Sequence, residues 1–312
     1  MKRLISAPWI NFAVLLLVNL LWAAQYPAYR FAGEHMEPAT LNFWTLLFAA
    51  CLLFPLWVLE KRRHKGERRA LQWKTAREFL LLGLLGIIPP SVMLSWGISQ
   101  SSASNAAILS LTIPILMIVL GIVMLGEKLT LIRVCSVVLG LVGTLLISTT
   151  DLAQASFSRR LLFGNLIILL AGLGSAFYNT YSKHLLLRYS ELELLLYSYS
   201  VGGAACAVIS VGFETRPFYR VAGYTGVTWL AVGVLGMLSW GIAMVLWMWV
   251  LNRLEVGQVS TSIYFLPLFG LILSIVTLHE RITTPQILGG ILTVVGTAML
   301  TLYEGRRVRH AT

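Results

Sequence analysis

Two short stripes of polar and aromatic side chains carry the most recognisable chemistry in this sequence. The first stripe lies on one face of the first apolar segment: Trp22, Gln25, Tyr26 and Tyr29. The second lies on the equivalent face of the sixth: Ser175, Tyr178, Asn179 and Ser182. These uncharged amides, hydroxyls and rings suit zwitterionic or apolar molecules, whereas a phosphate ester would require several Lys or Arg side chains. Because a polar stripe is costly against lipid, both are expected to face the protein interior, either lining a cavity or bonding helices together.

Other candidates for binding come from later segments. Asn105 and Gln258 occupy equivalent positions near two segment starts, while Trp240, Met244 and Trp247 share one helix face. The complete predicted substrate-binding set is Trp22, Gln25, Tyr26, Trp96, Asn105, Tyr178, Asn179, Trp240, Trp247 and Gln258. The histidines are scattered at segment ends, and the sequence shows no spacing typical of a metal site. We therefore predict no catalytic residue, no metal site and no cofactor.

The composition identifies the elements that must position these residues. Of 312 residues, 57% are hydrophobic and 12% are charged, about half the charged fraction of a soluble domain. Ten apolar segments are expected, each close to the length of a membrane helix: 8–31, 38–59, 78–98, 102–125, 130–149, 162–184, 191–213, 224–250, 256–278 and 284–303. The sequence predicts an all-α integral membrane protein. Its cysteines, Cys51, Cys135 and Cys206, are expected to be buried and unpaired.

The positive charges predict the orientation of the chain. With the N-terminus in the cytoplasm, 18 of the 24 Lys and Arg residues fall on the cytoplasmic side and 6 outside. Both termini and the basic connection Glu60–Glu78 are therefore expected to be cytoplasmic, in a bacterial inner membrane. The net charge of +11 follows this pattern, so it indicates contact with the lipid bilayer and not with nucleic acid.

The sequence also repeats itself after 153 residues. At this offset Pro114 matches Pro267, Glu127 matches Glu280, and Trp96 matches Trp249. The predicted repeats are residues 1–150 and 154–312, with five helices each. Because five is odd, the second repeat must enter the membrane in the opposite sense, an arrangement common in secondary transporters with a central cavity.

The repeated motif resembles a known family. The pattern is Pro114, then Gly126-Glu127-Lys128-Leu129-Thr130, then Gly140 and Gly143, and it returns from Pro267 to Gly296. It is similar to the paired EamA domains of the drug/metabolite transporter superfamily, and the similarity covers nearly the whole chain. The resemblance implies ten helices around a central cavity and transport of small organic metabolites by alternating access.

Four repeated residues have expected structural roles. Pro114 and Pro267 each remove a backbone hydrogen bond within a helix, so they are either hinges or static kinks. Glu127 and Glu280 lie just before the last helix of each repeat. They are expected to be turn residues that stabilise the start of that helix, with Lys128 as a partner for Glu127.

The favoured function is a secondary carrier for amino acids or related small organic solutes, with export suggested by the resemblance alone. The alternatives are a channel or flippase for lipid-linked molecules and, less favoured, a membrane-embedded enzyme. No carboxylate lies in the middle of an expected segment, which argues against a buried proton relay. The sequence leaves the substrate, the coupling ion and the oligomeric state open; a monomer is compatible with it.

Overall fold

The computed structural model describes residues 8–23, 25–63, 73–100, 109–147, 159–269 and 284–310. Every regular element in these ranges is helical. The first repeat contains α1 (Pro8–Ala23), α2 (Gln25–Gly33), α3 (Pro38–Arg63), α4 (Trp73–Gly86), η1 (Pro89–Met93), α5 (Leu94–Gln100), α7 (Thr112–Leu125) and α8 (Leu131–Ile147). The second contains α10 (Arg159–Leu185), α11 (Glu191–Phe213), α12 (Gly226–Gly233), η2 (Val234–Ala243), α13 (Met244–Arg253), α14 (Val256–Ser260), η3 (Thr261–Tyr264) and α16 (Thr284–His310).

Local chemistry sets several helix ends. At the start of α11, the Ser190 side chain accepts a hydrogen bond from the Glu193 N–H, and the Glu193 carboxylate accepts one from the Ser190 N–H. At the end of α7, Gly126 adopts φ 68°, a left-handed conformation that glycine tolerates best. These two turns fix where the chain reverses direction.

The lengths of the helices agree with a membrane protein. Among the described residues, five helices are long and apolar enough to cross a membrane, and five shorter apolar helices accompany them. The first expected segment, 8–31, contains two helices, α1 and α2, instead of one. Cys206 is buried, but Cys51 and Cys135 are exposed, so the prediction of three buried cysteines was wrong for two of them.

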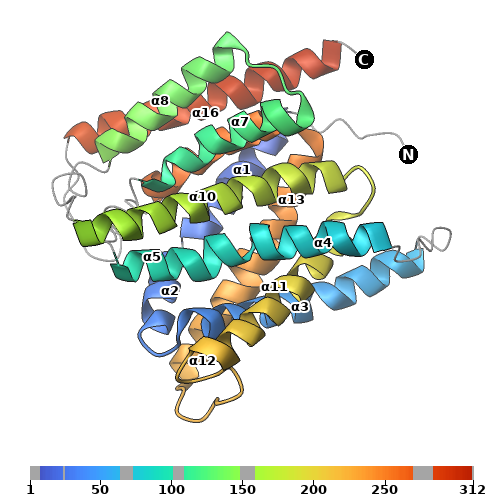
Figure 1. Cartoon of the computed structure of the whole chain (residues 1–312). Helices are drawn as coiled ribbons and strands as arrows, with labels where there is room; N and C mark the ends of the chain where they lie inside the picture. Colours follow the sequence, from blue (N-terminus) through green and yellow to red (C-terminus); the bar gives the residue numbers. More distant parts are fainter. Residues whose placement is uncertain are drawn as a thin grey trace.

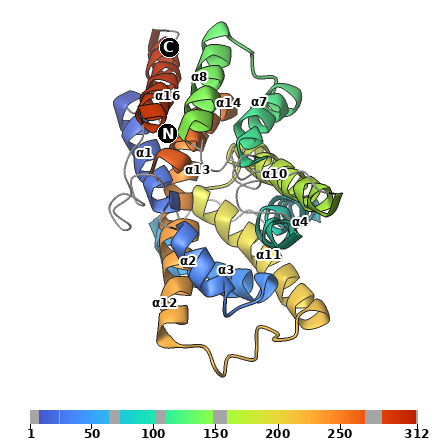
Figure 2. The same cartoon turned by 90° about the vertical axis from the view of Figure 1, so that its left-hand side faces the viewer.

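The two repeats are intertwined, as Figures 1 and 2 show. Helix α1, from the first repeat, packs against α13, η2 and α16 of the second. Helix α10, from the second repeat, packs against α4, α5 and α7 of the first. Other close pairs, such as α3 with α11 and α8 with α16, also join one helix from each repeat. Most large contacts therefore lie between the repeats.

Helices α8 and α16 meet through small residues. A side chain at Gly143 would collide with the Gly289 carbonyl oxygen at 2.6 Å, and one at Gly296 would lie 3.0 Å from the Ser136 carbonyl oxygen. The Ser136 hydroxyl donates a hydrogen bond to the Gly296 carbonyl at 2.7 Å. These small residues let the two helices approach closely, as small residues commonly do where membrane helices pack together.

Both helices that contain the repeated prolines become irregular at the same position. Helix α7 begins at Thr112 with Leu111 as its N-cap residue, three residues before Pro114. The 3₁₀ helix η3 ends at Tyr264, three residues before Pro267. Leu111 and Tyr264 are equivalent at the 153-residue offset. These breaks are compatible with both the hinge and the static kink.

The third segment of each repeat contains a π-helix. In the first repeat it is η1, which begins with two prolines, and in the second it is the longer η2. A π-helix widens the turn and often marks a functional site. Trp240 lies in η2 and Trp247 in the following α13, and the two rings donate to different partners, Tyr29 and Asn179.

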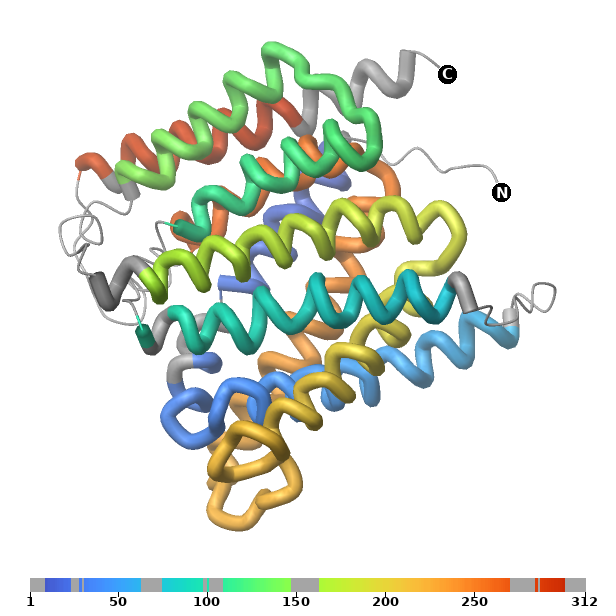
Figure 3. Tube along the Cα trace, viewed as in Figure 1, coloured from blue at the N-terminus to red at the C-terminus, as the bar shows by residue number. Residues whose placement is uncertain are grey.

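Figure 3 follows the path of the chain. The turns between α7 and α8 and between α10 and α11 lie on the right-hand side of this view. The end of α3 and the beginning of α4 lie on this side as well. We call this side the turn face and the other side the opposite face.

Candidate functional site

An aromatic pair, of which Trp247 is buried and Trp22 partly buried, joins the two repeats. The rings of Trp22 in α1 and Trp247 in α13 lie 4.8 Å apart at 49°. The Trp247 indole N–H donates to the Asn179 side-chain oxygen at 2.6 Å, and the Asn179 amide donates to the Ser175 carbonyl in its own helix at 2.8 Å. The Trp22 N–H donates to the Ser239 carbonyl at 3.3 Å. Trp247 thus connects the two predicted stripes.

A second group of hydrogen bonds joins Trp240 and Ser198 to three tyrosines. Trp240 donates to the Tyr29 hydroxyl at 2.9 Å, and the Tyr199 hydroxyl donates to the Trp240 carbonyl at 2.7 Å. The hydroxyls of Tyr178 and Ser198 lie 3.1 Å apart. These contacts join α2, η2, α10 and α11 in the interior, where neutral hydrogen-bonding groups are rarely left alone.

Four polar atoms of α1, α10 and η2 nevertheless have no hydrogen-bond partner among the described residues. They are the Asn19 side-chain oxygen and the hydroxyls of Thr180, Ser182 and Ser239. All four residues are buried. An unpaired buried polar group costs about 1–3 kcal/mol, so such atoms call for a water molecule or a ligand. We call Asn19, Trp22, Asn179, Ser239 and Trp247 the central cluster.

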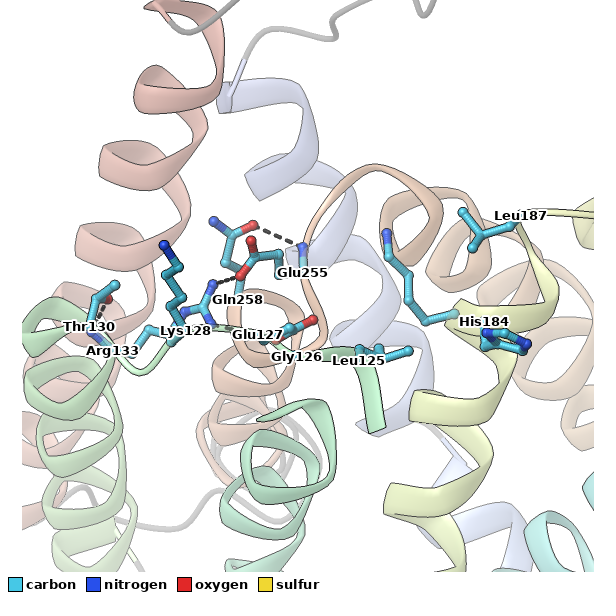
Figure 4. A pocket seen from close by; sticks show the side chains of 11 residues that line it. Leu125, Gly126, Glu127, Lys128, Thr130, Arg133, His184, Leu187, Glu255 and Gln258 are labelled. Carbon is cyan, nitrogen blue, oxygen red and sulfur yellow. Dashed lines mark hydrogen bonds and ion pairs between the residues drawn. The ribbon is translucent and has the colours of Figure 1, made fainter. Parts of the chain in front are cut away.

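A separate pocket of about 520 Å³ lies on the turn face (Figure 4). Both repeats contribute to its wall: Leu125, Gly126, Glu127, Lys128, Thr130, Arg133, Lys183, His184, Leu187, Glu255 and Gln258. The Glu127 carboxylate accepts hydrogen bonds from the backbone N–H groups of Val256 at 2.6 Å and Gly257 at 3.0 Å. A residue of the first repeat therefore binds the first turn of α14 in the second.

Arg133 completes this contact. Its side chain is only 3% exposed, and it pairs with Glu127 at 3.5 Å and with Glu255. It also donates to the Lys128 carbonyl at 2.7 Å. Lys183 lies nearby and donates to the carbonyls of Leu251, Asn252 and Leu254 at the end of α13. Both cations line the pocket, and both donate hydrogen bonds to protein carbonyls.

The structure brings together five of the ten predicted substrate-binding residues. Trp22, Tyr178, Asn179, Trp240 and Trp247 belong to the buried hydrogen-bond groups described above.

The other predicted residues fall elsewhere. Trp96 is 49% exposed and packs edge-on against Phe163. Gln258 lies in the first turn of α14, where its side-chain oxygen accepts from the Glu255 N–H at 3.1 Å. The side chains of Gln25 and Tyr26 lie outside the described residues, as do Asn105 and Glu280.

Glu127 differs from its expected arrangement. It was expected beside the start of α8 with Lys128 as partner, but it binds α14 and pairs with Arg133. The sequence gives no direct sign of this because Glu127 and α14 are about 130 positions apart.

Sequence reasoning missed Asn19, Ser239, Arg133 and Glu255. Asn19 could have been found, because it lies one helical turn before Trp22 on the same face. Arg133 was counted only as a topology signal, although it is the one charged residue within α8. A buried charge needs a partner, which would have pointed to Glu127 nearby.

Comparison with known proteins shows which family this architecture is similar to. A family model described as "EamA-like transporter family" matches residues 9–149 and 162–302. The two matched segments begin 153 residues apart, which is the offset of the sequence repeat.

Among curated relatives, the "Uncharacterized transporter YoaV" of Bacillus subtilis is 27% identical over 300 residues, which cover 94% of this chain and 97% of the relative. The "Probable terminal-alkyne amino-acid exporter" of Streptantibioticus cattleyicolor is 26% identical over 316 residues, covering 99% and 98%. A solved crystal structure with 20% identity matches with a TM-score of 0.77 and covers 96% of this chain and 98% of its own. That match concerns the fold alone.

Proposed function

Because the chain belongs to the EamA-like transporter family, we propose that this multi-pass membrane protein is a secondary carrier that exports small organic solutes, amino acids or related compounds, by alternating access. The transporter class follows from the family. The solute class and the direction are supported by the name of the Streptantibioticus relative, "Probable terminal-alkyne amino-acid exporter".

The observation that carries the proposal is the central cluster. It lies where α1 of one repeat meets η2 and α13 of the other and where α13 meets α10, and it combines two indoles 4.8 Å apart with unpaired polar atoms on Asn19 and Ser239. An amide oxygen and a hydroxyl can bind the ammonium and carboxylate of a zwitterion, while the indoles cover its apolar part. We infer that the solute is held here between the repeats.

The remaining parts of the proposal concern the membrane. We propose ten spans, formed by the five long helices and the five shorter apolar ones, in two inverted repeats. We further propose that both termini face the cytoplasm of a bacterial inner membrane, since most Lys and Arg residues then lie inside. Pro114 and Pro267 are proposed as hinges beside the two equivalent helix breaks.

The test is transport by purified protein in liposomes. Labelled neutral amino acids and amphiphilic organic compounds would be screened for saturable uptake that is accelerated by unlabelled solute on the other side. Acceleration by counter-flow is expected of a carrier, because the loaded site returns faster than the empty one. Saturable uptake without counter-flow acceleration would contradict alternating access, and linear uptake would indicate a channel.

A further inference from the structure

The ionic contacts of this protein are distributed unevenly between its two faces. The ion pairs that join described residues all lie on the turn face: Lys61 with Glu193, Arg188 with Glu78, and Arg133 with Glu127 and Glu255. Carboxylates between α3 and the α11–α12 connection bind neutral groups instead. There Glu214 accepts from the N–H groups of Ala39 and Thr40, and Glu37 accepts from the Arg216 N–H.

Each of these groups joins the two repeats, and Arg133 and Glu127 are the most deeply buried charged residues among them. Arg133 is in α8 and Glu127 in the turn before it, whereas Glu255 precedes α14 of the other repeat (Figure 4). Arg133 and Glu127 are nearly buried, with side chains 3% and 7% exposed. Electrostatic attraction is stronger at such a site than in water, so separating the charges is unfavourable while the contact stays dry.

The second repeat lacks the charges that would build the same contact on the opposite face. At the 153-residue offset, the counterpart of Arg133 is Gln286 and that of Glu255 is Ser102. The counterpart of Glu127 is Glu280, so one carboxylate is repeated while the bridging pair is not. The side chains of these three counterparts lie outside the described residues, and this comparison uses their types alone.

We propose that Arg133, Glu127 and Glu255 form an ionic latch on the turn face, and that the carrier without solute therefore rests with this face closed and the opposite face accessible. Two inverted repeats with identical contacts would favour the two facing states equally. A charged contact on one side only shifts that equilibrium by its differential stability. With the predicted orientation the latch lies on the cytoplasmic side, so a cytoplasmic solute must first open it.

The latch rests on the proposed alternating-access carrier, but its test needs no solute. In a variant without the three native cysteines, Ser260→Cys is the reporter, because Ser260 in α14 is fully buried beside the latch. Leu129→Cys, in the exposed α7–α8 turn, marks the turn face. Both are labelled with an impermeant maleimide in inside-out and right-side-out vesicles.

The decisive change is Arg133→Gln, which gives this position the residue type of its counterpart Gln286. We expect labelling of Ser260→Cys from the turn face to accelerate about tenfold, which corresponds to about 1.4 kcal/mol. The matched control is Arg188→Gln, which removes an ion pair from the same face but not from the α7–α14 contact. Arg133→Lys should restore slow labelling.

Unchanged labelling in correctly folded Arg133→Gln protein would overturn the latch, as would an equal acceleration in Arg188→Gln. If Arg133→Gln fails to fold, Glu255→Gln decides the question in the same way, because the Glu255 side chain is 50% exposed and tolerates change more easily. Transport is measured in the same vesicles. Faster labelling together with no carrier-type transport would show that the ionic contact closes the turn face, but it would refute the proposed function.

Discussion

The hydroxyl of Ser239 gives the sharpest test of the central cluster. It is buried, with 1% of the residue exposed, and has no hydrogen-bond partner among the described residues. A hydroxyl that only joins helices would have such a partner. Ser239→Ala should therefore leave the stability of the empty protein unchanged or raise it, because it removes a polar group whose burial costs about 1–3 kcal/mol.

The same change should weaken solute binding. Loss of one hydrogen bond to bound solute costs about 0.5–1.5 kcal/mol, which is about twofold to tenfold in affinity. The control is Ser198→Ala, whose hydroxyl contacts Tyr178 at 3.1 Å and donates to the Leu195 carbonyl at 3.1 Å. That variant should lower the melting temperature, because a paired buried group is lost.

Two measurements decide between these readings: thermal unfolding in detergent, with and without solute, and the concentration dependence of uptake in liposomes. If Ser239→Ala lowers the melting temperature as much as Ser198→Ala and leaves the affinity unchanged, the hydroxyl is structural. The proposed site at the central cluster would then be wrong.

Three further predictions concern movement, topology and energy. Pro114→Ala and Pro267→Ala should each slow transport per folded molecule by restoring a backbone hydrogen bond beside the helix breaks. Transport rates equal to that of the unaltered protein in both variants would show that the kinks are static. A cysteine at Glu34 should react with an impermeant reagent from outside intact cells, and reaction only after lysis would reverse the predicted orientation. Uptake of a neutral amino acid should follow its own gradient, so accumulation driven by an imposed pH difference would disprove the absence of proton coupling.

Part of the candidate site was predictable from residue types. Trp22, Asn179 and Trp247 were recognised because polar or amphipathic side chains at helical spacing in an apolar helix must face the interior. Their pairing was not predictable. The sequence placed Trp22 and Asn179 on two separate stripes, and nothing in it indicated that Trp247 of α13 makes the connection from Trp22 to Asn179 that the structure describes.

Sequence alone determined the class of protein and the repeat, because exclusion from water acts on each segment through its own composition. Its motif also identified the family. Only the tertiary structure decided which helices of one repeat pack against helices of the other, that Trp96 faces outward, and that Glu127 binds α14. In lipid, apolar side chains hardly distinguish one neighbouring helix from another. The rotation and partner of each helix therefore depend on close packing and on a few buried polar contacts between residues far apart in the chain.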